Sequence, residues 1–191
     1  MVKGFFKVLL STILIALLAI SIVGCDDVTE DEARAMVEDF LTNAYELNEI
    51  YYGGGLEYKD DGNPNNIYKP VRETAKYTTK SALVEKTYEV FSETYAFSLI
   101  EMAFNGVQSE INQNSVMARY MVMGDLGDDI YVNIEYEPVV DKIAEYDFST
   151  IEIGKISGTF IEATVKTVDG VTVDVTLINE SDGWRLDSGT Y

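Results

Sequence analysis

The fold of this chain is decided by residues 160–177, which read FIEATVKTVDGVTVDVTL. In this stretch Phe160–Thr167 and Val171–Leu177 flank the dipeptide Asp169-Gly170, which favours the tight turn of a β-hairpin. Apolar and polar residues alternate along Val171–Leu177, which is the period of a strand with one buried face. The stretch therefore predicts two antiparallel strands whose apolar face is covered by other elements.

Alternation and turn signals predict further strands on both sides of this hairpin. A turn at Asp182-Gly183 leads into the last of them, and 137–146 is expected to be a connection. Pro70 confines the earliest and shortest strand to a sheet edge, because proline cannot donate to a central ladder. The additional strands are expected at 67–71, 116–123, 130–136, 151–156 and 184–187.

The first half of the chain has helical periodicity instead. Thr29-Glu30-Asp31-Glu32 has the form of a capping box, so a helix is predicted to begin there. The triplet Gly53-Gly54-Gly55 ends it, since consecutive glycines are poor helix formers. A phosphate-binding loop is disfavoured, because no Lys-Ser or Lys-Thr follows the triplet. The buried stripe of this helix is expected to contain Ala33, Met36, Val37, Phe40, Leu41, Ala44, Leu47 and Tyr51.

Two more helices are predicted over Ser81–Phe91 and Ser92–Phe104, with Ser92 as an N-cap and Asn105-Gly106 as a stop. Helices followed by strands indicate an α+β fold. We therefore expect about three N-terminal helices packed on one face of a curved, mainly antiparallel sheet of about five strands. No linker divides residues 29–191, which are predicted to be a single domain.

The N-terminus has the three parts of a secretory signal peptide. Two basic residues, Lys3 and Lys7, precede the apolar run Val8–Val23, and a small residue stands before the cut. The run closes with Ile22-Val23-Gly24-Cys25, which resembles a bacterial lipobox. In lipoproteins with this motif the cysteine receives a diacylglycerol and becomes the first residue.

The lipobox resemblance implies a signal peptide over 1–24, and a lipidated Cys25 with a short linker over 25–28. Cys25 is also the one cysteine of the chain. An uncleaved membrane helix is the main alternative, but such a helix needs about 20 apolar residues. We therefore expect the protein on the outer face of the cytoplasmic membrane, held there by its lipid.

The composition of the chain argues against several kinds of function. Removing Lys3 and Lys7 from the 14 basic residues leaves 12 against 33 acidic residues, a formal charge of −21. So acidic a chain repels phosphate backbones, which argues against nucleic-acid binding. The chain contains no histidine, which removes Ser-His-Asp and Cys-His catalysis and His-ligated metals. No cofactor is expected.

A calcium loop is an alternative interpretation of the polar segment before the first short strand. Asp60, Asp61, Asn63 and Asn65 have the right oxygen ligands, but the spacing does not continue to the bidentate glutamate of the twelve-residue loop. The segment is therefore predicted to be a turn-rich connection.

Four segments give the mature region a resemblance to the DL-endopeptidase inhibitor (IseA-like) family of Gram-positive bacteria. They are Tyr51–Gly55, Val90–Ala96, Asp129–Asn133 and Gly183–Tyr191. The last is also similar to the final strand of the cone-shaped nuclear-transport-factor-like domains. The inhibitor resemblance implies a protein that blocks the active-site groove of NlpC-type cysteine peptidases, which cut peptide stems in the cell wall.

The expected function is thus that of a non-enzymatic binding or inhibitory lipoprotein, with a cell-wall peptidase or a peptidoglycan fragment as its partner. The alternative is a small-ligand carrier with a pocket between sheet and helices, lined by Tyr52, Tyr68, Tyr77 and Tyr95. A glycosidase-like enzyme using two carboxylates is a third hypothesis, but the sequence selects no pair from 33 acids.

Overall fold

The structure is a computed structural model that describes most of the chain. The predicted signal peptide, the lipobox and Cys25 lie outside the described residues, and so does the start of the strand predicted at 116–123. Within the described part, no helix is long and apolar enough to cross a membrane. The described residues are 28–106, 117–123, 127–138, 140 and 142–191.

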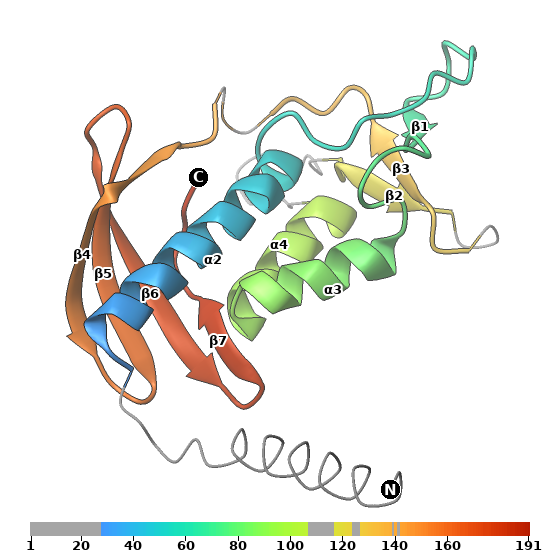
Figure 1. Cartoon of the computed structure of the whole chain (residues 1–191). Coiled ribbons are helices and arrows are strands. Elements are labelled where there is room, and N and C mark those ends of the chain that lie inside the picture. Colours follow the sequence, from blue (N-terminus) through green and yellow to red (C-terminus); the bar gives the residue numbers. More distant parts are fainter. Residues whose placement is uncertain (1–27, 107–116, 124–126, 139, 141) are drawn as a thin grey trace, which may run out of the picture.

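Helices and strands follow one another largely in the expected order (Figure 1). Helices come first, interrupted by one short strand, and strands occupy the second half of the chain. The elements are α2 (Glu30–Tyr51), β1 (Tyr68–Pro70), α3 (Lys80–Val90), α4 (Glu93–Asn105), β2 (Tyr120–Val122), β3 (Ile130–Asn133), β4 (Tyr146–Ile156), β5 (Phe160–Thr167), β6 (Thr172–Glu180) and β7 (Gly183–Leu186).

The strands form two antiparallel sheets, with the orders β1-β3-β2 and β4-β5-β6-β7. The α+β class is confirmed, whereas the prediction of one curved sheet of about five strands is wrong. The strand predicted to run to Tyr136 ends at Asn133, whose side-chain oxygen accepts a hydrogen bond of 3.0 Å from the amide of Glu135. This local bond turns the chain out of the first sheet before the second begins.

The long strand β4 begins at Tyr146, five residues before the strand predicted at 151–156. Its pairing with β5 is shifted between Asp147 and Glu152, and again between Ile153 and Lys155. Such bulges place successive side chains out of simple alternation. The alternating pattern was therefore hidden over the first half of this strand.

Helix α2 has the predicted capping box. The amide of Glu32 donates to the Thr29 hydroxyl at 3.3 Å, and the amide of Thr29 donates to the Glu32 carboxylate at 2.9 Å. The helix lies across the four-stranded sheet and beside α3 (Figure 1). A hydrogen bond of 2.7 Å between the hydroxyls of Tyr51 and Thr87 joins the two helices. The buried residues of α2 are Ala33, Val37, Leu41, Ala44, Leu47, Asn48, Ile50 and Tyr51.

The predicted break between the second and third helices is also present. Ser92 caps α4 by accepting from the amide of Tyr95 at 3.3 Å, and its own amide donates to Leu186 at 2.9 Å. Phe91, fully buried, forms a bridge to Leu186 of β7. The break thus attaches the helix pair to the edge of the four-stranded sheet.

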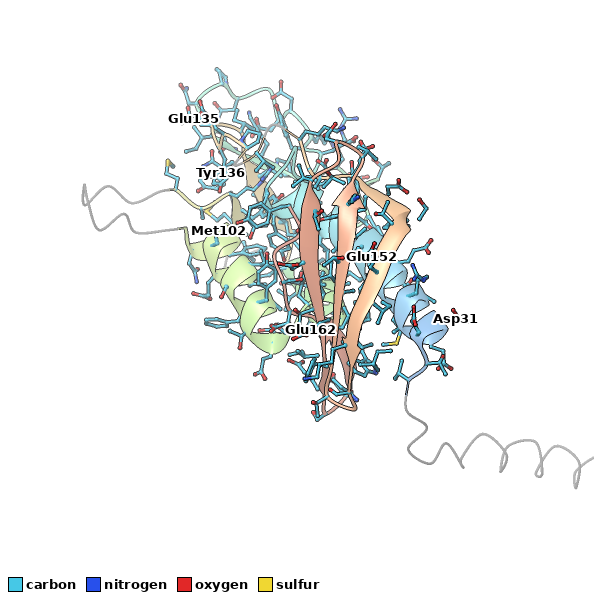
Figure 2. The ribbon with its side chains drawn as sticks, turned by 90° about the vertical axis from the view of Figure 1, so that its left-hand side faces the viewer. Asp31, Met102, Glu135, Tyr136, Glu152 and Glu162 are labelled. Carbon is cyan, nitrogen blue, oxygen red and sulfur yellow. The ribbon has the colours of Figure 1, made fainter. Side chains whose placement is uncertain are left out.

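The two faces of the four-stranded sheet differ. One face packs beneath the helices with Ile151, Ile161 and Leu177 among its buried residues. The other carries exposed residues such as Glu152 and Glu162, and no helix of the described part covers it (Figure 2). The core is a single cluster that also includes residues of the smaller sheet.

Candidate functional site

The end of α2 is held by side chains from the start of β2. A helix leaves its last carbonyl groups without partners, and α2 has no basic residue in its last turn. Arg119 supplies the missing cation: its Nη1 donates to the carbonyl of Tyr51 at 3.1 Å, and its Nη2 to that of Gly53 at 2.5 Å. The hydroxyl of Tyr120 donates to the carbonyl of Ile50 at 2.7 Å.

Gly55 makes room for this arrangement. Its φ of +82° is a conformation that side chains rarely adopt, and its amide donates to the carbonyl of Glu49 at 2.9 Å. A Cβ atom added to Gly55 would collide with the guanidinium of Arg119. The glycine triplet ends the helix as predicted, and its third member also gives the guanidinium space.

Arg119 is unusual among the charged residues. Two cations are buried in the described part of the chain, Lys69 and Arg119, each 3% exposed. Lys69 forms ion pairs with Asp60, at 3.3 Å, and with Asp61. Arg119 has no carboxylate within 4.0 Å among the described residues. Buried charges are ordinarily paired, so the surroundings of Arg119 are the strongest candidate for a binding site.

Those surroundings form an open groove of about 710 Å³, which we call the Arg119 groove. Arg119 lies at its floor and also faces the ring of Tyr136, with 5.2 Å between Cζ and the ring centroid. Figure 2 shows Tyr136 at the end of the molecule away from Asp31, which belongs to the first turn of α2. The groove is lined by Gly54, Gly55, Leu56, Glu57, Tyr58, Asp60, Arg72, Arg119, Val132, Asn133, Ile134, Tyr136 and Pro138.

The rim of the Arg119 groove carries exposed apolar residues beside its charged ones. Tyr58 and Ile134 are each 42% exposed and belong to the few large hydrophobic residues that face solvent in the described structure. Pro138 also belongs to the lining. Exposed apolar groups that surround a buried polar group are typical of ligand sites.

The charged side chains of the lining balance one another, with Glu57 and Asp60 against Arg72 and Arg119. Glu57 lies 3.9 Å from Arg72, and Asp60 lies 3.3 Å from Lys69. The pKa of Asp60 is lowered by a hydrogen bond from the amide of Gly62 and by Lys69, so this carboxyl group stays ionised. Each acid of the lining thus has a cation other than Arg119 within 4.0 Å, although Lys69 is shared with Asp61.

The tyrosines predicted to line a pocket have other positions. Tyr52, buried, stacks on Tyr191 with ring centroids 4.0 Å apart, and Tyr95 packs against Phe91 at 5.1 Å. Tyr68 donates to the carbonyl of Ala118 at 3.1 Å. None of these three belongs to the lining of the Arg119 groove.

Tyr77, the fourth predicted pocket tyrosine, is buried and lines a separate depression of about 560 Å³. This depression shares Gly55, Leu56 and Glu57 with the Arg119 groove, so the two adjoin at this segment. Burial raises the pKa of Tyr77. The phenol is therefore neutral at ordinary pH, which suits packing.

The segment that resembles a calcium loop holds an ammonium group instead. Lys69 reaches into it from β1, pairs with Asp60 and Asp61, and donates to the carbonyl of Asn63 at 2.6 Å. Asp61 also accepts from Asn66 at 2.7 Å. In the described part of the chain, no three acidic or sulfur ligands are grouped to hold a metal ion.

Comparison of the chain with protein-family models, curated proteins and solved structures finds no match. The resemblance to the inhibitor family and the similarity to cone-shaped domains therefore stay predictions.

Sequence reasoning did not find Arg119. The alternation over 116–123 placed its side chain on the face opposite Tyr120. In the structure β2 begins only at Tyr120, and both side chains are buried. No sequence signal singled it out, since α2, α3 and α4 all have no basic residue in the last turn.

Proposed function

We propose that this protein is a lipid-anchored, non-enzymatic binding protein on the outer face of the cytoplasmic membrane, and that the Arg119 groove is its binding site. In the inhibitory form of this proposal, the partner is a cell-wall peptidase of the NlpC type. The observation that carries the proposal is an open groove with exposed apolar residues on its rim and, at its floor, a buried cation that has no carboxylate within 4.0 Å among the described residues.

The chemistry of the groove favours binding over catalysis. A general acid of a glycosidase needs a carboxyl group whose pKa is raised. The pKa of Asp60 is lowered instead, and Glu57 is exposed beside Arg72. Arg119 is committed to the end of α2 through two hydrogen bonds, so it is a rigid donor.

The position of the groove suits a tethered binding protein. Cys25 precedes the first residue of α2 by five positions, and the groove lies at the other end of that helix. A helix of 22 residues is about 33 Å long. With a lipid on Cys25, α2 would hold the groove away from its attachment point and accessible to partners in the wall.

The test uses a soluble fragment that begins at Asp26 and therefore keeps every described residue. We expect it to bind and slow at least one member of a panel of purified NlpC-type peptidases. Replacing both rim residues, Tyr58→Ser and Ile134→Ser, should weaken that binding at least tenfold. Phe97→Ser is the matched control, because Phe97 is 57% exposed on α4 and outside the groove.

A panel in which no peptidase binds or slows would contradict the inhibitory form. Equal binding by the rim variant and the Phe97→Ser control would show that the partner uses another surface. Both results leave the lipid anchor to be tested separately.

The second candidate is a small-ligand carrier, and the size of the groove favours it. Ligand pockets ordinarily enclose roughly 300–1,000 Å³, and the Arg119 groove lies within this range at about 710 Å³. A ligand bound to the folded state raises the melting temperature. Thermal melting against wall fragments, lipids and metabolites that gives no shift would contradict this candidate.

A further inference from the structure

We propose that the Arg119 groove binds a short peptide through a free carboxylate, with Arg119 as the charge partner. This inference rests on the proposed binding function and names the ligand class of the same site. It follows from the unused donors of Arg119, from the charge balance of the groove and from its rim.

The guanidinium of Arg119 has donors to spare. An arginine carries five N–H donors in a planar fork, and the described structure uses one from Nη1 and one from Nη2. The other buried polar side chain of the lining, Asn133, is occupied: it donates to Ala118 at 3.2 Å and accepts from Glu135 at 3.0 Å. Arg119 is therefore the group that a ligand meets at the floor.

The charges of the groove favour a singly charged anion. Glu57 pairs with Arg72, and Asp60 and Asp61 share Lys69, so Arg119 is the lining cation with no carboxylate within 4.0 Å among the described residues. A carboxylate matches that charge and accepts two parallel hydrogen bonds from a guanidinium. A phosphate carries about −1.5 to −2 charges at neutral pH. The lining as a whole has no net charge, because Glu57 and Asp60 balance Arg72 and Arg119, so nothing in it offsets the additional charge.

The rim selects a peptide over a small inorganic anion. Tyr58, Ile134 and Pro138 offer apolar surface above the buried cation. A carboxylate alone would leave this surface in water, whereas a peptide with an aliphatic side chain covers it. The groove therefore fits an apolar segment that ends in, or closely precedes, a carboxylate.

The experiment is an NMR titration of the soluble protein that begins at Asp26, with N-acetyl-leucyl-alanine as the probe. Its C-terminal amide serves as the matched ligand, and inorganic phosphate as the second anion. We expect the free acid to bind at least tenfold more tightly than the amide. It should shift the amide signals of Gly54–Leu56 and the Nε–H signal of Arg119.

A variant on the rim tests the site without touching the helix end. Ile134→Asp places a negative charge beside the groove at an exposed position, so we expect it to weaken binding of the acid at least tenfold and to leave the amide unchanged. Phe97→Asp adds the same charge on α4 and should change neither.

Equal affinity for acid and amide, tighter binding of phosphate, or no shift from any probe at millimolar concentration would each overturn the carboxylate proposal. Failure here is distinguishable from failure of the proposed function. If a peptidase binds through the rim residues but the titration shows no shift, the proposed function stands and the carboxylate ligand is contradicted.

Discussion

Nη2 of Arg119 donates a 2.5 Å hydrogen bond to the carbonyl oxygen of Gly53, although the two residues are 66 positions apart. This bond joins the end of α2 to the start of β2 and sets the floor of the Arg119 groove at the same point. Stability of the helix end and availability of the binding site therefore depend on one side chain.

Arg119→Met is expected to destabilise the protein, because it removes the cation that completes α2. A hydrogen bond to a charged group contributes about 1.5–3 kcal/mol, and Met fills part of the space. We expect a loss of about 2–4 kcal/mol in the free energy of unfolding, measured by urea denaturation followed by circular dichroism. Lys166→Met is the control, since Lys166 is exposed on β5. Equal stability of the two variants would contradict the role of Arg119.

Gly55→Ala and Gly170→Ala form a matched pair. Both glycines have positive φ, +82° and +84°, so both variants carry the left-handed strain of about 1–2 kcal/mol. Only Gly55 faces the guanidinium of Arg119; a Cβ at Gly170 meets nothing within 4 Å. Gly55→Ala should therefore lower the free energy of unfolding by about 1 kcal/mol more than Gly170→Ala. Equal losses would show that the guanidinium moves aside freely.

The sequence predicts this fold well where the signal is local. The capping box at Thr29, the cap at Ser92 and the hairpin turn at Asp169-Gly170 each depend on a few adjacent residues, and all three lie where they were expected. The strand β4 was half missed because its bulges break the alternation. Division into two sheets was missed because it depends on which strands pair, and alternation along one strand does not encode its partner.

The candidate site was beyond sequence reasoning for a different reason. Arg119 joins a segment far away in the chain, and no local pattern encodes which carbonyl groups it reaches. Residue type is what favours the four tyrosines as pocket lining, and it does not distinguish a pocket wall from the core. The polar segment at Asp60 and Asp61 was likewise ambiguous, because its cation comes from Lys69, outside the segment.

Cys25→Ser tests the membrane anchor, which is predicted from the sequence alone. The thioether to diacylglycerol needs the cysteine sulfur, so we expect the variant to incorporate no labelled palmitate and to keep its signal peptide. Wild type should partition with membranes, since two acyl chains give stable residence where one is marginal. Continued labelling of the variant would contradict the lipoprotein assignment.

The ion pairs of Lys69 predict how its loop responds to acid. The hydrogen bond from Lys69, followed by those from Asn66 and the amide of Asn63, lowers the pKa of Asp61 well below its ordinary value of 3.8. A carboxyl group with a lowered pKa in the folded state contributes stability above its unfolded pKa and loses it as the pH falls toward the folded pKa. In the wild-type protein, the ion pair between Lys69 and Asp61 should therefore persist at pH 4 and break only in stronger acid.

Lys69→Met should raise the pKa of Asp61 toward 3.8, because the largest cause of the lowering is removed while those of Asn66 and Asn63 are kept. Carboxyl carbon signals followed by NMR from pH 6 to pH 2 measure this shift directly. Asp128 is the internal control: its pKa is lowered by the hydroxyl and the amide of Ser81, so its titration should not move. An unchanged Asp61 in the variant would show that the amide groups alone hold the carboxylate.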